Sequence, residues 1–437
     1  MSFMSSSSVQ RSPENRKREL SLFKEMPAFR RLLTGWTISA LGDSLNQAAV
    51  IFLVLSATGG EGLQTGLAVG LRLSSRLIFA GLGGVLADRF ERRNVLVLLD
   101  LCLGITALLF IFAGITRSLP GLYILTILMG ALSAAHAATR PVYLRDVTGA
   151  DRFDQALALI QVGFGLMLFL GYGLGGALLS IAGCAIVFTL DALSFFFSAL
   201  CTWTTRPAQP QKRSVDSMTK RGVFREWLLG WQYLKTKPVL LYMVLTNAIW
   251  SLGGGSVFVL ISLLNYRDFN NNPITLGLFF AMTGVGALGA AWIRPKLGRG
   301  FTREAQIIGW ACVIEGIVFL LLPHIQLLPL ALAALAAQFS AAFLFGLAYQ
   351  PLLLRETDAF LRGRISGLDN GIYLSLYGVS AAVHGSVATA LGLEKTAAIA
   401  GCIMASAGLF WFRFLGSPKS KRITPGKPAA HPDIIKS

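Results

Sequence analysis

Charged side chains inside long apolar stretches are the residues of this chain that could do chemistry. Asp43 and Asp100 lie several residues inside such stretches, and so do Arg72 and Arg76. An ionisable group near the centre of a lipid bilayer costs at least about 2.5–3.5 kcal/mol unless it is paired or hydrated, so it is a functional candidate by default. Acids and arginines at this depth can form a buried ion network or bind and release protons.

The depth of these four residues predicts two buried ion pairs, Asp43–Arg72 and Asp100–Arg76. Arg76 follows Arg72 by four positions, which places both guanidinium groups on one face of a helix. Two interpretations remain open: the pairs are a structural network, or Asp43 gains and loses a proton as the protein works. Removing one partner would leave a buried charge at a cost of about 3–5 kcal/mol, so both interpretations predict damage on mutation.

Two further acids and two histidines lie in apolar stretches. Asp191 is a second candidate for proton or ion coupling, with a structural role as the open alternative, whereas Glu315 is interpreted as a structural contact. His136 and His384 could titrate near neutral pH. A lone histidine in a membrane is more often a hydrogen-bonded packing group, and both interpretations stay open.

The composition of the chain predicts that membrane-spanning segments position these residues. The chain has 437 residues, of which 54% are hydrophobic and only 14% charged, against about 25% charged residues in soluble domains. Apolar stretches of about 20 residues recur along it, each long enough to cross a hydrocarbon core of about 30 Å as a helix. The net charge of +17 lies in the gaps and the two tails, which argues against a nucleic-acid partner and for a polytopic membrane protein in contact with the lipid bilayer.

Twelve membrane-spanning helices are predicted. A lipid-exposed single strand cannot satisfy its backbone, and the stretches are too long and too uniform for a β-barrel, so the expected fold class is all-α. The predicted spans are 32–56, 64–87, 94–116, 121–144, 156–181, 184–204, 239–264, 274–296, 305–323, 327–350, 366–390 and 394–415.

Loop charges predict the orientation and the division of the chain. The odd-numbered loops hold Arg117, Arg267 and Lys395 as their only cations, whereas the even-numbered loops and both tails are basic. The positive-inside rule therefore places both termini and the even loops in the cytoplasm. The polar connector 205–238 divides an N-terminal bundle, 32–204, from a C-terminal bundle, 239–415, with cytoplasmic tails at 1–31 and 416–437. Two pseudo-symmetric six-helix bundles with a site between them are the usual plan of a transporter.

Sequence motifs for other chemistry are missing. The sequence has no GxxxxGK[ST] loop, no HExxH and no CxxC, and its five cysteines lie within or beside apolar stretches. No enzymatic activity, cofactor or metal site is therefore predicted. An ion gradient or the gradient of the substrate would have to supply the energy.

The segment GGVLADRFERRN, residues 83–94, resembles a known pattern. Its residues Gly84, Asp88, Arg89, Arg92 and Arg93 look like the signature between the second and third spans of the major facilitator superfamily, with Glu91 where that signature has glycine. The resemblance implies a charge network that holds the cytoplasmic side of the two bundles together. It also implies that, in the outward-facing state, Asp88 docks against the helix end at the start of span eleven, where Asp369 lies. These six residues, without Glu91, are the predicted gate motif.

The resemblance covers nearly the whole chain. LGDSLNQAA, LDALSFFFSAL and LRGRISGLDNG are similar to the branch of the superfamily that holds macrolide and siderophore exporters. GYGLGG, residues 171–176, is similar to a glycine-proline motif of antiporters, with Tyr172 in place of the proline. The resemblance implies a bacterial inner-membrane transporter, expected to be a monomer, that exports small amphipathic molecules in exchange for protons.

The same resemblance points to residues that line a substrate cavity. In the superfamily, spans one, four, seven and ten surround the cavity. The interpretation that these side chains bind an amphipathic ligand stands beside the interpretation that they are packing contacts between helices. The candidates are Asn46, Gln47, His136, Asn247, Trp250, Gln338 and Phe339.

Two alternatives to a proton-coupled exporter remain. One is a uniporter or importer of a metabolite or lipid-like substrate. Accumulation that survives Asp43→Asn would show that Asp43 does not couple transport to protons. The other is a membrane sensor or assembly factor that does not transport, which predicts no alternating accessibility.

Overall fold

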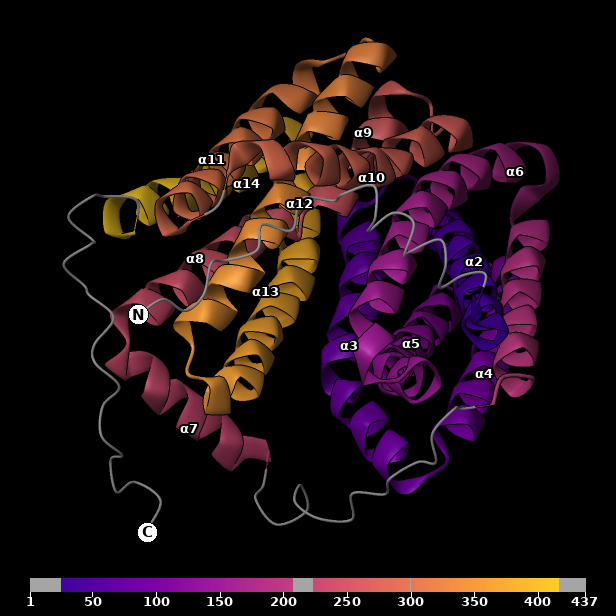
Figure 1. Ribbon diagram of the computed structural model, residues 1–437. Helices are drawn as coiled ribbons and strands as arrows, with labels where there is room; N and C mark the ends of the chain where they lie inside the picture. Colours follow the sequence, from indigo (N-terminus) through magenta and orange to yellow (C-terminus); the bar gives the residue numbers. More distant parts are fainter. Residues whose placement is uncertain (1–24, 207–222, 299, 416–437) are drawn as a thin grey trace, which may run out of the picture.

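The computed structural model describes residues 25–206, 223–298 and 300–415 (Figure 1). Within these ranges it leaves out the side chains of residues 77, 78, 80–88, 150, 154, 223–229 and 359. The regular elements of the described part are all helical, and most of them are long and apolar. The all-α fold predicted from the sequence is thereby confirmed.

The N-terminal bundle is formed by α2 (Pro27–Thr58), α3 (Gly62–Arg89), α4 (Arg92–Ile115), α5 (Leu119–Thr148) and α6 (Phe153–Trp203), with the short η1 (Ala150–Arg152) before α6. Helix α6 is broken at Gly183 so that it supplies two spans.

The C-terminal bundle follows the helix α7 (Val223–Thr236). Its helices are α8 (Pro238–Gly254), α9 (Val257–Asp268), α10 (Pro273–Ile293), α11 (Phe301–Leu321), α12 (Leu328–Glu356), α13 (Arg362–Leu391) and α14 (Leu393–Phe414). Three single turns lie between them: η2 (Arg294–Leu297), η3 (Leu322–His324) and η4 (Ala359–Leu361).

The twelve predicted spans correspond to these helices. Ten helices of the described chain are long and apolar enough to cross a membrane. The twelve spans are reached by counting α6 twice and adding α3, which has 28 residues and carries Arg72 and Arg76. The loop expected between the fifth and sixth spans is a single break at Gly183, where φ is +75°, a conformation that glycine adopts without steric cost.

Span seven also differs from its prediction, because it is broken into α8 and α9. At the break, a Cβ on Gly255 would meet the carbonyl oxygen of Tyr377 and lie 2.7 Å from Cβ of Ser380. The absence of a side chain at Gly255 thus allows α13 to approach the backbone here.

Asn272 caps the start of α10, because its Oδ1 accepts a hydrogen bond from the backbone N–H of Ile274 at 2.8 Å.

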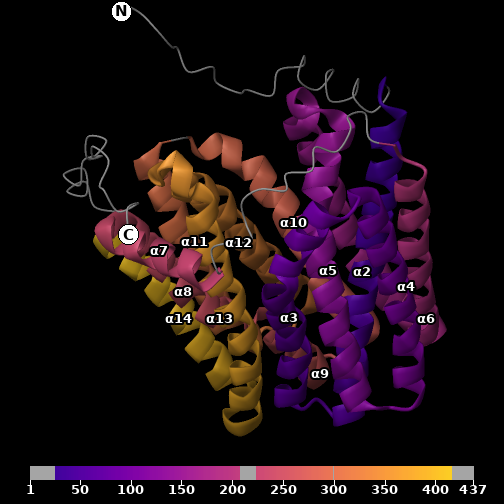
Figure 2. The same ribbon diagram turned by 90° about the horizontal axis from the view of Figure 1, so that it is seen from below.

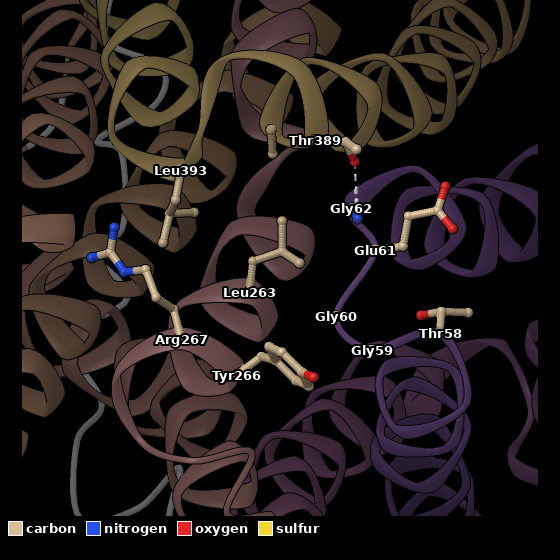
Figure 3. A pocket seen from close by; sticks show the side chains of 11 residues that line it. Thr58, Gly59, Gly60, Glu61, Gly62, Leu263, Tyr266, Arg267, Thr389 and Leu393 are labelled. Carbon is tan, nitrogen blue, oxygen red and sulfur yellow. Dashed lines mark hydrogen bonds between the residues drawn. The ribbon is translucent and has the colours of Figure 1, made fainter.

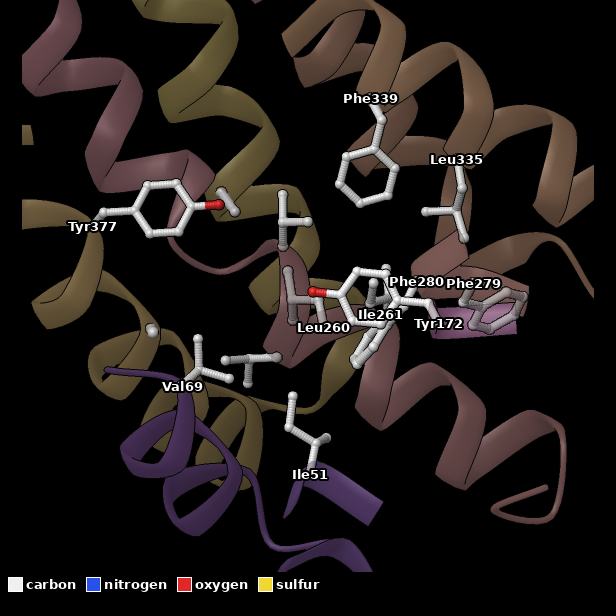
Figure 4. Packing of buried hydrophobic residues seen from close by; sticks show 14 of the residues in the cluster. Ile51, Val69, Tyr172, Leu260, Ile261, Phe279, Phe280, Leu335, Phe339 and Tyr377 are labelled. Carbon is white, nitrogen blue, oxygen red and sulfur yellow. The ribbon is translucent and has the colours of Figure 1, made fainter. Parts of the chain in front are cut away.

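The two bundles lie side by side and share one apolar core. Figure 2 shows them close together at the end where α9 lies and spread apart toward the other end. Figure 4 shows Ile51, Val69 and Tyr172 of the N-terminal bundle against Leu260 and Tyr377 of the C-terminal bundle. We call the close end the 59–61 end, after the loop between α2 and α3, and the opposite end the connector end.

Closely packed small residues join the bundles at the 59–61 end. A Cβ on Gly66 would meet the carbonyl oxygen of Ala381, and one on Gly70 would lie 2.6 Å from the carbonyl oxygen of Gly378. We call this contact the glycine seam, formed by Gly62, Gly66 and Gly70 of α3 with Gly378, Ala381 and Gly385 of α13. At the connector end of α13, a Cβ on Gly363 or Gly367 would have nothing within 4 Å.

A second contact between the bundles joins α6 to α10. A Cβ on Gly176 would meet the carbonyl oxygen of Pro273 and lie 2.9 Å from Cα of Gly277. Both contacts pair the second span of one bundle with the fifth span of the other. The glycines of GYGLGG therefore serve close packing, with Gly171 against Ser44 of α2 and Gly176 across the interface.

Candidate functional site

The buried charges of the N-terminal bundle centre on Asp43 of α2. Its Oδ1 lies 2.5 Å from Arg72 Nη2, and its Oδ2 lies 3.9 Å from Arg76 Nη2. Arg72 also donates to Oδ1 of Asn46 at 3.5 Å. The predicted Asp43–Arg72 pair is confirmed, and one carboxylate faces two arginines that lie one helical turn apart. The Arg72 side chain is 7% exposed and the Arg76 side chain 37% exposed.

The predicted pair between Asp100 and Arg76 is wrong. Asp100 is fully buried on α4, where its Oδ2 accepts from the Ser198 hydroxyl at 2.8 Å and its Oδ1 lies 3.0 Å from His136 Nε2. The physical reason is packing, because α4 lies mainly against α5 and α6, and α3 turns Arg76 toward α2. His136, predicted to line the cavity, is buried between α4 and α5 in this conformation.

Arg140 is a third, partly buried cation among the spans of this bundle, which sequence reasoning missed. Its Nη2 donates to the Ser39 hydroxyl at 3.2 Å, and its guanidinium lies 5.4 Å from the Trp36 ring centre and 5.3 Å from that of Phe164. Its position inside the predicted span 121–144 was the signal that could have found it. No salt bridge involves Arg140 in the described part of the chain, and stacking on aromatic faces stabilises such an arginine.

Asp191 is buried beside α2 without a hydrogen-bond partner for either carboxylate oxygen among the described atoms. A Cβ on Gly42 would lie 2.7 Å from Asp191 Oδ1, so the acid fits against a glycine next to Asp43. An unpaired ionised carboxylate costs several kcal/mol at such a site. Asp191 thus lies in the interior of the N-terminal bundle, next to the helix that carries Asp43.

Gln47 connects the polar face of α2 to α6. Its Oε1 accepts from the Tyr172 hydroxyl at 2.8 Å. Tyr172 packs edge-on against Phe280 of the C-terminal bundle, with ring centres 5.4 Å apart. The tyrosine that replaces the antiporter proline thus joins the charged face of one bundle to the aromatic face of the other.

The C-terminal bundle holds a buried carboxylate at Glu315 of α11. Its Oε1 accepts from Trp250 Nε1 at 3.0 Å, and its Oε2 accepts from Gln338 Nε2 at 3.3 Å. Both donors are neutral. When the carboxyl group is ionised, each of these hydrogen bonds stabilises it by about 1.5–3 kcal/mol. Trp250 and Gln338 are two of the predicted cavity residues, but the acid that joins them was taken for a structural contact.

Aromatic side chains surround Trp250. Its ring stacks on Phe345 at 4.9 Å between centres and lies 6.0 Å from Tyr373 and 6.2 Å from Tyr377. Tyr373 and Tyr377 pack together on α13, with ring centres 5.4 Å apart. These tyrosines on α13 gave no separate signal in the sequence, because their contact with Trp250 exists only in the folded bundle. Together with Phe345 they form an aromatic group around Trp250.

Asp369 is not at a helix start, as the sequence analysis expected. Because α13 begins at Arg362, Asp369 lies two turns inside the helix and is fully buried. Its Oδ1 accepts from Tyr349 Oη at 2.7 Å and from Asn247 Nδ2 at 3.0 Å. In this conformation Asp369 belongs to the interior of the C-terminal bundle. Tyr349 was missed, although it lies in span ten.

The remaining candidates are apolar or packing groups in this conformation. Phe339 is 5% exposed and lies 6.1 Å from Phe258 between ring centres. His384 Nδ1 lies 3.1 Å from the Ser380 hydroxyl and 3.0 Å from its carbonyl oxygen. His384 therefore fits the packing interpretation.

The gate motif lies at the connector end, between α3 and α4. Arg89 ends α3, and Arg92 Nη1 lies 2.7 Å from Asp146 Oδ2 at the end of α5. Arg93 lies over the Trp203 ring at 5.3 Å. Gly84 and Asp88 lie in the last turns of α3, but their side chains are outside the described part of the chain.

Glu91 fits the turn without glycine. Its φ is −64°, which any residue adopts, and its Oε2 accepts from Asn94 Nδ2 at 3.0 Å in the first turn of α4. The acid stands just before the helix N-terminus, where negative charge is favourable.

The C-terminal bundle has a matching ion pair with the opposite polarity. Glu304 of α11 lies 2.8 Å from Arg355 Nη2 of α12 and 3.4 Å from Arg294 Nη2. In both bundles the pair joins the third span to the fourth. The N-terminal pair places its cation on the third span, and the C-terminal pair places its acid there.

A hollow of about 330 Å³ lies between the bundles at the 59–61 end. Figure 3 shows the loop of Gly59 and Gly60 facing Tyr266 and Arg267 of α9, with Thr389 bonded to Gly62. The hydroxyl of Thr389 accepts from the backbone N–H of Gly62 at 3.1 Å. Side-chain hydrogen bonds of this kind add to the glycine seam at the closed end.

Comparison with known proteins identifies the family. The model of the Major Facilitator Superfamily matches residues 32–383. The chain belongs to the Major Facilitator Superfamily. It is 26% identical over 424 residues to the enterobactin exporter EntS of Citrobacter koseri, covering 94% of this chain and 98% of that protein. It is 25% identical over 404 residues to the uncharacterized MFS-type transporter YfiS of Bacillus subtilis, covering 90% of this chain and 94% of that one.

Solved structures of the superfamily share the fold. The nucleoside transporter NupG aligns with a TM-score of 0.69 at 10% identity, over 89% of this chain and 99% of NupG. A bacterial homologue of the human lysosomal transporter Spinster, in an inward-facing and unoccupied conformation, aligns with a TM-score of 0.68 at 15% identity, over 89% of this chain and 97% of that one. As a member of the Major Facilitator Superfamily, the chain is a membrane transporter for a small-molecule substrate and not an enzyme.

Proposed function

We propose that this transporter exports small amphipathic molecules across the bacterial inner membrane in exchange for protons. Both termini then face the cytoplasm, as the loop charges predict, and the connector end opens to the cytoplasm. A substrate enters the space between the bundles from that side, and the opposite conformation releases it beyond the 59–61 end. One chain is sufficient for this cycle, so the expected state is a monomer.

The observation that carries the proposal is the position of Asp43 against α3. Asp43 of α2 lies between Arg72 and Arg76 of α3. The first half of α3 forms the glycine seam with α13. Protonation of Asp43 would leave the two arginines without their shared carboxylate, next to each other on α3. The change in charge would therefore act directly on the helix that closes the 59–61 end.

The surfaces around Arg76 support an amphipathic substrate. The Arg76 guanidinium is partly exposed, and the aromatic group around Trp250 lies in the C-terminal bundle. A ligand with an aromatic body and a polar or anionic group would match both the aromatic group and the guanidinium. The relatives named as enterobactin exporters support a substrate of this kind.

Transport into everted membrane vesicles tests the proposal. The vesicles come from a strain that lacks its own exporters, carry an imposed pH gradient, and are offered enterobactin, a macrolide and an amphipathic dye. We expect pH-dependent accumulation of at least one probe by the wild type. Asp43→Asn should abolish accumulation but retain counterflow of the same probe, and Asp151→Asn, at an exposed aspartate of η1, should change neither.

Other outcomes identify the alternatives. Accumulation by Asp43→Asn equal to that of the wild type would refute Asp43 as the coupling group. Counterflow by the wild type without pH-dependent accumulation would indicate a uniporter. Retained counterflow also shows that the variant is folded, which matters because the substitution leaves Arg72 without its partner at a cost of about 3–5 kcal/mol.

A further inference from the structure

Glu315 is a carboxylic side chain inside the membrane-spanning part of the C-terminal bundle. It is 1% exposed, and its two oxygens accept from Trp250 Nε1 at 3.0 Å and Gln338 Nε2 at 3.3 Å. No salt bridge involves Glu315 among the residues that the structure describes. In this respect it differs from Asp43, which faces two arginines.

The groups that face Glu315 come from every helix packed around it. The next residue, Gly316, packs against backbone atoms of α14, which bring no charge to this point. The ionisable or polar groups that face the acid are all neutral at physiological pH. Among the described residues they are Trp250 of α8 and Gln338 of α12, which donate to it, and Cys312, one turn earlier on its own helix; Tyr373 and Tyr377 of α13 lie against the Trp250 ring.

Gln338 can serve both protonation states of this acid. Its Nε2 donates to Glu315, and its Oε1 is buried without a partner among the described atoms. A side-chain amide that turns over presents a carbonyl oxygen, which accepts from a carboxylic acid O–H. Trp250, in contrast, can only donate, and a hydrogen bond to a charged acceptor is about twice as strong as one to a neutral acceptor.

We propose that Glu315 is a proton-binding site of the C-terminal bundle, separate from Asp43, and that the Trp250 indole transmits its protonation state to the bundle interface. Glu315 takes a proton from water in one conformation, becomes a neutral acid, and returns the proton to water in the other. Protonation weakens the Trp250 bond and releases the indole to shift against Phe345 and Tyr373. The role in coupling depends on the proposed function, whereas proton binding does not.

Infrared difference spectroscopy on the full-length protein in lipid nanodiscs tests proton binding directly. Spectra are recorded from about pH 5 to about pH 9, the range in which buried carboxyl groups with shifted affinities titrate. We expect a carbonyl band of a protonated acid that grows on acidification and shifts in D2O. Glu315→Gln should lose this component, and Glu394→Gln, at an exposed acid of α14, should retain it.

Trp250→Phe provides a second test that leaves the acid in place. Without the indole N–H, the carboxylate loses one stabilising bond, so the transition of the same band should move toward higher pH by about one unit. The pH-dependent part of the tryptophan fluorescence should vanish in both Trp250→Phe and Glu315→Gln. Size-exclusion profiles check that each variant is folded.

Two results would overturn the proposal. One is a band of unchanged size in Glu315→Gln, and the other is a transition that Trp250→Phe does not shift. A normal band in a protein that shows no pH-driven transport would retain the proton site and refute the proposed coupling. Transport that depends on Asp43, together with no titration of Glu315, would support the proposed function and refute the proton site at Glu315.

Discussion

Replacing Gly385 by alanine perturbs the glycine seam at its most crowded position. The new Cβ would meet the carbonyl oxygen of Gly62, and it would lie 2.9 Å from the carbonyl carbon of Gly62 and 3.1 Å from Cα of Gly66. These neighbours are backbone atoms of α3 and cannot rotate away. The methyl group must therefore push α3 and α13 apart at the 59–61 end.

Overpacking of this kind costs about 1–3 kcal/mol. In the transport cycle proposed above the seam separates in the opposite conformation, so the cost applies only to the conformation closed at the 59–61 end. A difference of this size changes the ratio of two conformations by about 5- to 150-fold. Gly385→Ala should therefore favour the conformation open at the 59–61 end.

Maleimide labelling of Val69→Cys, in a background without the five native cysteines, measures the change. Val69 is 4% exposed in the closed interface (Figure 4), so its labelling rate reports opening. We expect labelling to increase by about 5- to 150-fold in Gly385→Ala. The matched control is Gly165→Ala, where a Cβ would have nothing within 4 Å. Equal labelling in the two variants would refute the reasoning.

Two further predictions concern the connector end. The Arg92–Asp146 pair should show a coupling of about 0.5–3 kcal/mol in a double-mutant cycle of Arg92→Gln and Asp146→Asn, measured by thermal unfolding in detergent; additive losses would contradict it. Burial raises the pKa of Tyr233 on α7 to about 12, and its hydroxyl donates to Asp358 Oδ2 at 2.8 Å. Because the pKa of Tyr233 is raised above its ordinary value, the contact should be intact below about pH 10 and lost as the pH rises through about 12. The difference in tyrosinate absorbance between the wild type and Tyr233→Phe, followed as the pH rises, checks this. If that difference reaches its full size by about pH 10, the reasoning is refuted.

The spans could be predicted from the sequence because lipid imposes a minimum apolar length on every helix. The same reasoning could not place the break of α6 at Gly183, since one residue with positive φ leaves the apolar stretch uninterrupted. Depth also identified Asp43 and Arg72 as partners. It paired Asp100 with Arg76 wrongly, because depth gives the height of a residue in the membrane but not the neighbour that its helix face meets.

The acids of the C-terminal bundle show the same limit. Asp369 was placed at a helix start because the sequence around Gly363 suggested a loop, whereas α13 begins at Arg362. Glu315 was assigned a structural role from its span alone. Its significance depends on Trp250 and Gln338, which lie 65 and 23 positions away in the chain and meet it only in the folded bundle.

The opposite polarity of the Arg92–Asp146 and Glu304–Arg355 pairs has a consequence for assembly. Two similar bundles emerge from one chain, and a third span could meet the fourth span of the wrong bundle while the helices insert. Such an exchange would bring Arg92 against Arg355 and Glu304 against Asp146, and like charges at close range repel. The two pairs therefore distinguish each bundle from its near copy while the protein is being made.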